Sequence, residues 1–137
     1  LTKMNVTIKF ISDGDVSGVI SVIDKESPVD IYLGVGGGPE GVLAAAALSC
    51  FGGQMQTRLV LDKDEEKRAM NLGITNYKKK YNIDEMVKGD VMFCASGVTD
   101  GDLVDGIKDE GDSYKASTYA LHKDLKICKK VTNIHKK

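Results

Sequence analysis

The sequence predicts an α/β domain, a layered α/β fold with a mixed central sheet and a C-terminal β-hairpin. Two observations predict this class. Runs with strand-like alternation take turns along the chain with segments of helical composition, and two further alternating runs separated by a short polar turn close it. At 137 residues the chain is long enough to bury a core of its own, which indicates one domain.

The first part of the chain contains two strand candidates and two helix candidates. Residues 5–11 (NVTIKFI) and 29–35 (VDIYLGV) alternate and are rich in β-branched residues, which favours strands. Residues 16–24 carry apolar side chains compatible with a short helix. Residues 40–51 are rich in Ala and Leu, with Pro39 suited to the first helical position, so a helix is expected there.

The second part continues the alternation of strands and helices. Residues 54–61 alternate like a strand, and residues 63–73 form a charged amphipathic helix that Gly73 ends. Residues 91–98 (VMFCASGV) are almost continuously apolar, which is typical of a strand buried on both faces. Residues 113–122 and 126–135 are the two strands of the expected terminal hairpin.

Composition excludes several classes of partner. The formal net charge of −1, with 28% charged residues, does not favour a nucleic-acid surface. No apolar run reaches the length of a membrane span, and no leader-like segment opens the chain. Three widely spaced cysteines, Cys50, Cys94 and Cys128, are typical of reduced thiols, which predicts a cytoplasmic protein.

A glycine cluster at residues 34–41 (GVGGGPEG) is the first candidate site. Gly36, Gly38 and Gly41 fit the dinucleotide-binding pattern, and Asp62 lies at the spacing of the acid that binds the ribose. Glu40 would repel a pyrophosphate at that helix start unless a cation intervened. A metal held by Glu40, beside a phosphate held by glycine amides, puts both groups to use. A tight turn whose acid complements the helix dipole is equally compatible with these residues.

A second candidate is the acidic turn Asp13-Gly14-Asp15, at the end of the first predicted strand. Its carboxylates could accept hydrogen bonds from sugar hydroxyls or hold a hard metal ion. The simpler interpretation is that Asp13 or Asp15 caps the following helix. The similar turn at residues 99–102 (TDGD) has the same two interpretations. His122 and His135 have no ligand partner at metal-binding spacing, so structural or surface roles are expected for them.

Several strings together resemble a known family. The strings "DGDV", "GVGGGPEGVLAAAAL", "GGQMQTRL", "RAMNLGI", "VKGDVMFCASGVTDGDL" and "IHKK" occur in unbroken order from about Val6 to His135. They resemble the C-terminal part of class II fructose-1,6-bisphosphatases, which belong to the lithium-sensitive, metal-dependent sugar phosphatases. Some members of that family also hydrolyse sedoheptulose 1,7-bisphosphate.

The resemblance implies roles for five residues. Substrate binding is expected from Asp13, Gly14, Asp15 and Gly37. Glu40 matches the family's metal-binding glutamate, which usually holds Mn²⁺ or Mg²⁺. Gly38 departs from the family pattern, where alanine is more often found, so the loop is expected to be looser than in other members.

The resemblance further implies that residues 1–137 form a single C-terminal domain. The remaining metal carboxylates, the activating groups and the phosphate clamps are expected in an N-terminal domain upstream, so no catalytic residue is assigned here. Hydrolysis of fructose 1,6-bisphosphate in gluconeogenesis is expected of the full-length cytoplasmic enzyme, a homo-oligomer in which this domain binds its own N-terminal domain. The domain alone is expected to be inactive. A dinucleotide-binding module and an interaction domain without a ligand stay open as alternatives.

Overall fold

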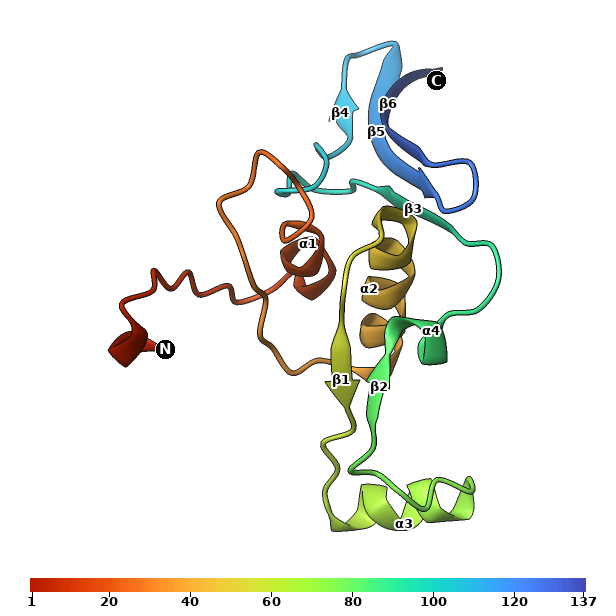
Figure 1. Ribbon diagram of the computed structural model, residues 1–137. Helices are drawn as coiled ribbons and strands as arrows, with labels where there is room; N and C mark the ends of the chain where they lie inside the picture. Colours follow the sequence, from red (N-terminus) through yellow and green to blue (C-terminus); the bar gives the residue numbers. More distant parts are fainter.

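The computed structural model describes residues 1–137 as helices and two antiparallel sheets (Figure 1). Along the chain the elements are a 3-10 turn at Thr2–Met4, α1 (Asp15–Ile20), α2 (Gly38–Phe51), β1 (Gln56–Arg58), α3 (Lys63–Asn71), β2 (Lys80–Asn82), α4 (Ile83–Met86), β3 (Met92–Ser96), β4 (Lys108–Asp109), β5 (Ser113–His122) and β6 (Ile127–Lys136). None of the helices combines the length and the hydropathy that crossing a lipid bilayer requires.

Strand β5 organises the larger sheet. It pairs with β6 over its whole length, and its other side pairs with β3 at one end and with β4 at the other. Phe93 of β3 lies opposite Leu121 of β5, and this pair faces the core. The smaller sheet is the ribbon β1–β2, which runs away from the larger sheet and leads to α3 (Figure 1).

Helix α2 lies at the centre of the molecule, between α1 and the larger sheet (Figure 1). Its run of Ala and Leu has high helix propensity, Pro39 occupies its first turn, and Gly52 ends it in the left-handed conformation (φ 71°). The buried side chains form two clusters around it. One contains Val19, Ala44, Ala45, Leu48 and Ile83, and the other contains Ile20, Ala47, Phe93 and Leu121.

The predicted α/β class is confirmed, together with the C-terminal hairpin. The helix expected at residues 40–51 is α2, and the charged helix expected at 63–73 is α3, followed by Gly73 in the left-handed conformation (φ 82°). Strands β5 and β6 form the predicted hairpin around a turn at residues 123–126. Local propensity and turn chemistry agree with the tertiary structure at these places.

Four predicted strands differ from the structure. Residues 5–11 and 29–35 are not strands, because no other segment of the chain pairs with their backbone. The strand expected at 54–61 shortens to β1, whose partner β2 is equally short. Residues 91–98 contain β3, which is not buried on both faces. It pairs only with β5, and along β3 only Phe93 is buried.

Candidate functional site

The acidic turn at Asp13-Gly14-Asp15 connects an extended segment to α1. Gly14 adopts the left-handed conformation (φ 81°, ψ 40°), which glycine reaches without the cost that a Cβ imposes. The Gly14 amide donates to Asp13 Oδ1 at 2.7 Å, and Ser17 Oγ donates to the Gly14 carbonyl at 2.7 Å. No side chain caps α1, so the interpretation of Asp13 or Asp15 as a helix cap is wrong.

Asp15 is held by a residue that sequence analysis did not assign to the site. The Tyr32 hydroxyl donates to Asp15 Oδ1 at 2.9 Å. Burial raises the pKa of Tyr32, and the hydrogen bond to Asp15 and its negative charge raise it further, so the phenol remains a neutral donor near pH 7. The sequence feature that could have identified Tyr32 is the alternation of residues 29–35. In an extended chain this alternation puts Tyr32 on the same side as Gly34 and Gly36.

Gly18 lets α1 approach the Tyr32 ring closely. A Cβ at Gly18 would lie 2.8 Å from that ring and 2.8 Å from the Ile11 side chain, well inside van der Waals contact. The ring therefore packs against the backbone of α1 while its hydroxyl reaches Asp15 at the start of the same helix. Two segments far apart in sequence are fixed to each other in this way.

The glycine loop lies against the same carboxylate. A Cβ at Gly36 would lie 2.6 Å from Asp15 Oδ2, so Asp15 would have to shift if another residue stood there. Gly37 precedes α2 in extended conformation (φ −66°, ψ 154°), and the Glu40 carboxylate folds back to the place where a side chain at Gly37 would stand. Around Gly38 there is open space.

The structure therefore brings Asp15 to Gly36 and Glu40 to Gly37. Asp13 is exposed, and its one hydrogen bond is to the adjacent Gly14 amide. No side chain caps α2, so Glu40 also complements the positive end of the helix dipole, as the simpler interpretation expected. The two roles of Glu40 are compatible.

The side chains of the candidate site offer the type of ligand atom that a hard divalent cation prefers, but too few of them to hold the ion. Asp15 and Glu40 present carboxylate oxygens at two consecutive glycines, and such oxygens are the ligands that Mg²⁺ and Mn²⁺ prefer. No group of three or more His, Cys, Asp or Glu side chains in the chain could hold a metal ion. Glu40 can therefore contribute to a metal site whose other ligands come from elsewhere.

Asp62 serves α3 and not a nucleotide site. Its Oδ1 accepts hydrogen bonds from the amides of Asp64 (2.9 Å) and Glu65 (2.8 Å), and the Glu65 carboxylate accepts from the Asp62 amide at 2.9 Å. This reciprocal pattern is a capping box. This role of Asp62 counts against the dinucleotide alternative.

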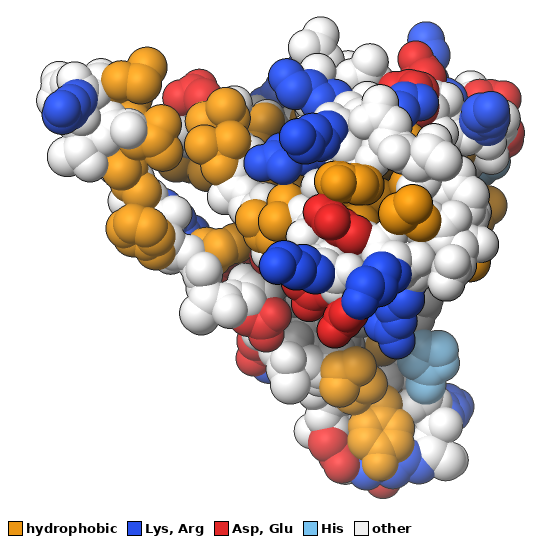
Figure 2. All heavy atoms as spheres, turned by 90° about the horizontal axis from the view of Figure 1, so that it is seen from below, with side chains coloured by type: hydrophobic (Ala, Val, Ile, Leu, Met, Phe, Trp, Pro, Cys, Tyr) orange, Lys and Arg blue, Asp and Glu red, His pale blue; other side chains and the backbone are white.

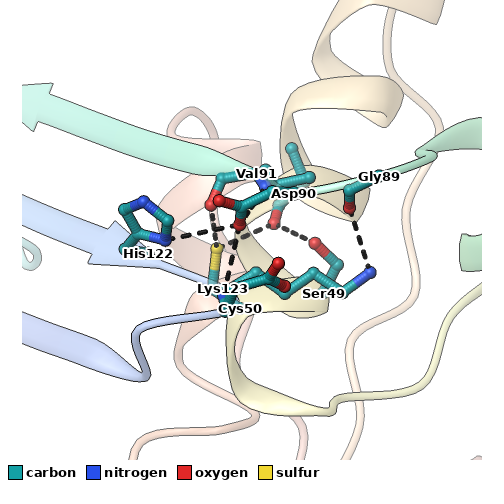
Figure 3. Close-up of polar contacts among 9 residues, drawn as sticks. Ser49, Cys50, Gly89, Asp90, Val91, His122 and Lys123 are labelled. Atoms are coloured by element: carbon teal, nitrogen blue, oxygen red, sulfur yellow. Dashed lines mark hydrogen bonds and ion pairs between the residues drawn. The ribbon is translucent and has the colours of Figure 1, made fainter.

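A separate polar cluster joins the end of α2 to the larger sheet (Figure 3). His122 Nδ1 lies 3.4 Å from Asp90 Oδ1, but this buried nitrogen has no hydrogen-bond partner. Asp90 Oδ1 also accepts from the Val91 amide at 2.8 Å. Burial raises the pKa of the Cys50 thiol, which lies 3.8 Å from the Val91 carbonyl. These contacts connect the end of α2 to the larger sheet, and they do not bring together the side chains that a metal ion would need.

Two hollows lie away from the predicted site. The larger, of about 500 Å³, adjoins the end of α2 and is lined by Ser49, Cys50, Phe51, Gly52, Lys123, Lys126, Ile127 and Cys128. The smaller, of about 120 Å³, lies beside the loop at residues 101–105. Neither contains Asp15, Gly37 or Glu40, whose positions are set by the contacts between α1, Tyr32 and the glycine loop.

Comparison with known proteins covers almost the whole chain. A family described as bacterial fructose-1,6-bisphosphatase, glpX-encoded, matches residues 1–135. The fructose-1,6-bisphosphatase 2 class 2 of Escherichia coli (strain K12) is 30% identical over 98% of this chain and 46% of its own length. The D-fructose 1,6-bisphosphatase class 2/sedoheptulose 1,7-bisphosphatase of Synechococcus sp. (strain JA-3-3Ab) is 33% identical over the full chain and 44% of its own length.

The chain thus spans a little under half the length of the curated relatives that it matches. The match runs through both the acidic turn and the glycine loop, the two segments that Tyr32 and Asp15 hold together. The chain belongs to the glpX-encoded family of bacterial fructose-1,6-bisphosphatases.

Proposed function

We propose that this chain supplies part of the sugar-phosphate site and one metal ligand of a class 2 fructose-1,6-bisphosphatase. The observation that carries the proposal is the juxtaposition of two carboxylates, Asp15 and Glu40, with consecutive glycines of one loop. The family match over residues 1–135 supports the substrate class, because the relatives are named for hydrolysis of fructose 1,6-bisphosphate. Some are also named for sedoheptulose 1,7-bisphosphate.

Different residues of the chain would bind the sugar and the phosphate-bound metal ion. Asp13 and Asp15 would accept hydrogen bonds from sugar hydroxyls, with Tyr32 keeping Asp15 in position. The backbone at Gly37 would approach the substrate closely, since no Cβ stands in the way. Glu40 would ligate Mn²⁺ or Mg²⁺, and such an ion lowers the pKa of a bound water and neutralises phosphate charge.

The whole enzyme would be a cytoplasmic homo-oligomer acting in gluconeogenesis, with this chain bound to the part that carries the other metal ligands. One glutamate cannot hold the ion in a reactive geometry, so we expect the chain alone to hydrolyse no bisphosphate. Adding Mn²⁺ and fructose 1,6-bisphosphate to the purified chain checks this expectation. Phosphate release above that of Glu40→Ala would contradict it.

A chimera provides the positive test. Replacing the matched part of the E. coli relative with this chain should give an enzyme that releases phosphate from fructose 1,6-bisphosphate. In that chimera Glu40→Gln should lower kcat/KM by about 100-fold or more, because a group stabilising transition-state charge is lost. Glu110→Gln, an exposed acid between β4 and β5, is the matched control and should change kcat/KM little. An inactive but folded chimera, or an active one indifferent to Glu40→Gln, would refute the proposed role.

A further inference from the structure

Two extended segments of the chain have no backbone partner. No backbone-to-backbone hydrogen bond involves residues 6–13 or 28–36. Unpaired amides and carbonyls on an extended chain are a template for another strand. The first of these segments projects from the rest of the molecule as the N-terminal arm in Figure 1.

Both segments also carry an apolar face that nothing covers. Alternating positions are exposed in each: Val6 (47%), Ile8 (39%) and Phe10 (89%) in the first, and Ile31 (66%), Leu33 (65%) and Val35 (82%) in the second. In an extended chain alternate residues share one face, so each segment presents a continuous apolar strip. Figure 2 shows hydrophobic side chains gathered along the projecting arm.

The accessible surface of the chain indicates how much area a partner could bury. The accessible surface of the chain is 10476 Å². A compact monomer of 14.8 kDa would expose about 7,000 Å². The excess, about 3,500 Å², is several times the roughly 800 Å² that each partner buries in an interface of standard size. Burial on that scale is typical of an obligate partner.

Both segments lead directly into the proposed site. Residues 6–12 run into the acidic turn at Asp13, and residues 28–35 run into Gly36 and the start of α2. A strand paired with either segment would place its own side chains beside Asp15 and Glu40. The site lacks metal ligands, and the relatives contain more than half of their length beyond the part that this chain matches.

We propose that residues 5–11 and 29–35 form a strand-pairing surface for the part of the family's polypeptide that this chain does not span, and that this pairing delivers the missing metal ligands to Glu40. The proposal rests on the proposed function for the identity of the partner. The pairing would supply main-chain hydrogen bonds for affinity and apolar side chains for register.

The experiment co-expresses the full chain with the part of the E. coli relative outside the match, so that neither has to fold alone, and purifies the two together. Failure of the two to purify together would overturn the proposal. We expect a 1:1 complex in analytical ultracentrifugation, and slower hydrogen exchange of the amides at residues 6–11 and 30–35. Val35→Lys should weaken the complex at least about tenfold, because it puts a charge into an apolar interface. Val98→Lys is the matched control, since Val98 is 77% exposed on a different loop, and it should weaken binding less than about twofold.

The outcomes separate this surface from the proposed function. If Val35→Lys weakens the complex but the complex hydrolyses no bisphosphate, the strand-pairing surface is supported and the proposed function is refuted. An active complex or chimera that is indifferent to Val35→Lys and leaves these amides unprotected would refute the surface and keep the function. A dimer of this chain alone with protection at both segments would also overturn the proposal. Far-UV circular dichroism of each variant confirms that it folds, as expected for side chains this exposed.

Discussion

At the level of single residues, the space available for a Cβ atom decides which positions of the loop require glycine. The Cβ position of Gly36 is taken by Asp15 Oδ2, whereas that of Gly38 is empty. Gly36 is therefore needed for the contact between the loop and the acidic turn. Gly38, at the first residue of α2, is a position where a side chain costs nothing and where the family was expected to carry alanine more often. The sequence shows five glycines in one cluster and does not distinguish these roles.

We predict opposite effects of two alanine substitutions in this loop. Gly36→Ala should lower the free energy of unfolding by about 1 kcal/mol, because Asp15 must move away from the new methyl group. Gly38→Ala should raise it by about 0.5–1 kcal/mol, because alanine restricts the unfolded chain and favours the helix. Urea unfolding at neutral pH measures both changes. Equal destabilisation by the two substitutions would show that the Asp15–Gly36 contact is not specific.

At the scale of elements, the helices differ in what holds them. α2 is stabilised by burial on several sides, with Ala44, Ala45, Ala47 and Leu48 in the two core clusters. α3 buries only Ala69, so its stability depends on local interactions. Its capping box satisfies amides at the start of the helix, and three acids in the first turn complement the helix dipole.

We therefore predict that Asp62→Ala loosens α3 locally. Loss of an N-cap costs about 1 kcal/mol, which corresponds to about a fivefold faster hydrogen exchange of the amides in α3. The rest of the chain should exchange as before, because α3 packs little against it. Met70→Ala is the control, since the Met70 side chain is 61% exposed in the same helix and takes no part in the cap. Faster exchange throughout the chain would contradict this local role of the cap.

At the scale of the whole molecule, the chain exposes more surface than its mass requires. Only 13 of its 137 residues are buried, and large apolar side chains remain at the surface, even on α2, where Val42 (47%) and Leu43 (51%) are exposed. A helix that is apolar on all sides is typical of the interior of a protein. The free chain should accordingly be only marginally stable, and its stability should respond to modest changes in conditions.

Acid should destabilise the whole chain. Hydrogen bonds from lysine side chains lower the pKa of three carboxyl groups: Lys79 acts on Glu85, Lys108 on Asp100, and Lys137 on Asp109. Carboxyl groups with lowered pKa in the folded state stabilise it above the pKa that they have when unfolded, about 4. This contribution is lost as the pH falls through the folded-state values. Because all three pairs are exposed, salt should reduce the contribution.

We therefore expect the urea midpoint to fall between pH 6 and pH 3 and to change little between pH 6 and pH 8. Asp109→Asn should reduce the drop, because it removes one of the three contributions. Asp112→Asn, which changes an exposed carboxylate without a side-chain partner of its own, should leave the drop unchanged. A midpoint that rises on acidification would contradict a stabilising role of these three ion pairs.

Features that depend on neighbouring residues could be predicted from the sequence. Helix α2 was predictable from its Ala and Leu content, Pro39 and Gly52, and α3 from its charge pattern and Gly73, because propensity and capping act within a few residues. The terminal hairpin followed from two alternating runs around one turn. The family resemblance, read from strings of residues, is confirmed by the match over residues 1–135.

Strand pairing and contacts between distant side chains could be learned only from the folded structure. Residues 5–11 and 29–35 have the composition of strands but remain unpaired, because a strand needs a partner that no local pattern specifies. The hydrogen bond from Tyr32 to Asp15 joins residues 17 positions apart and requires Gly18 to let the ring approach α1. Contacts of this kind depend on packing between distant segments, which is why the sequence named residues of the candidate site but not the contacts that hold them together.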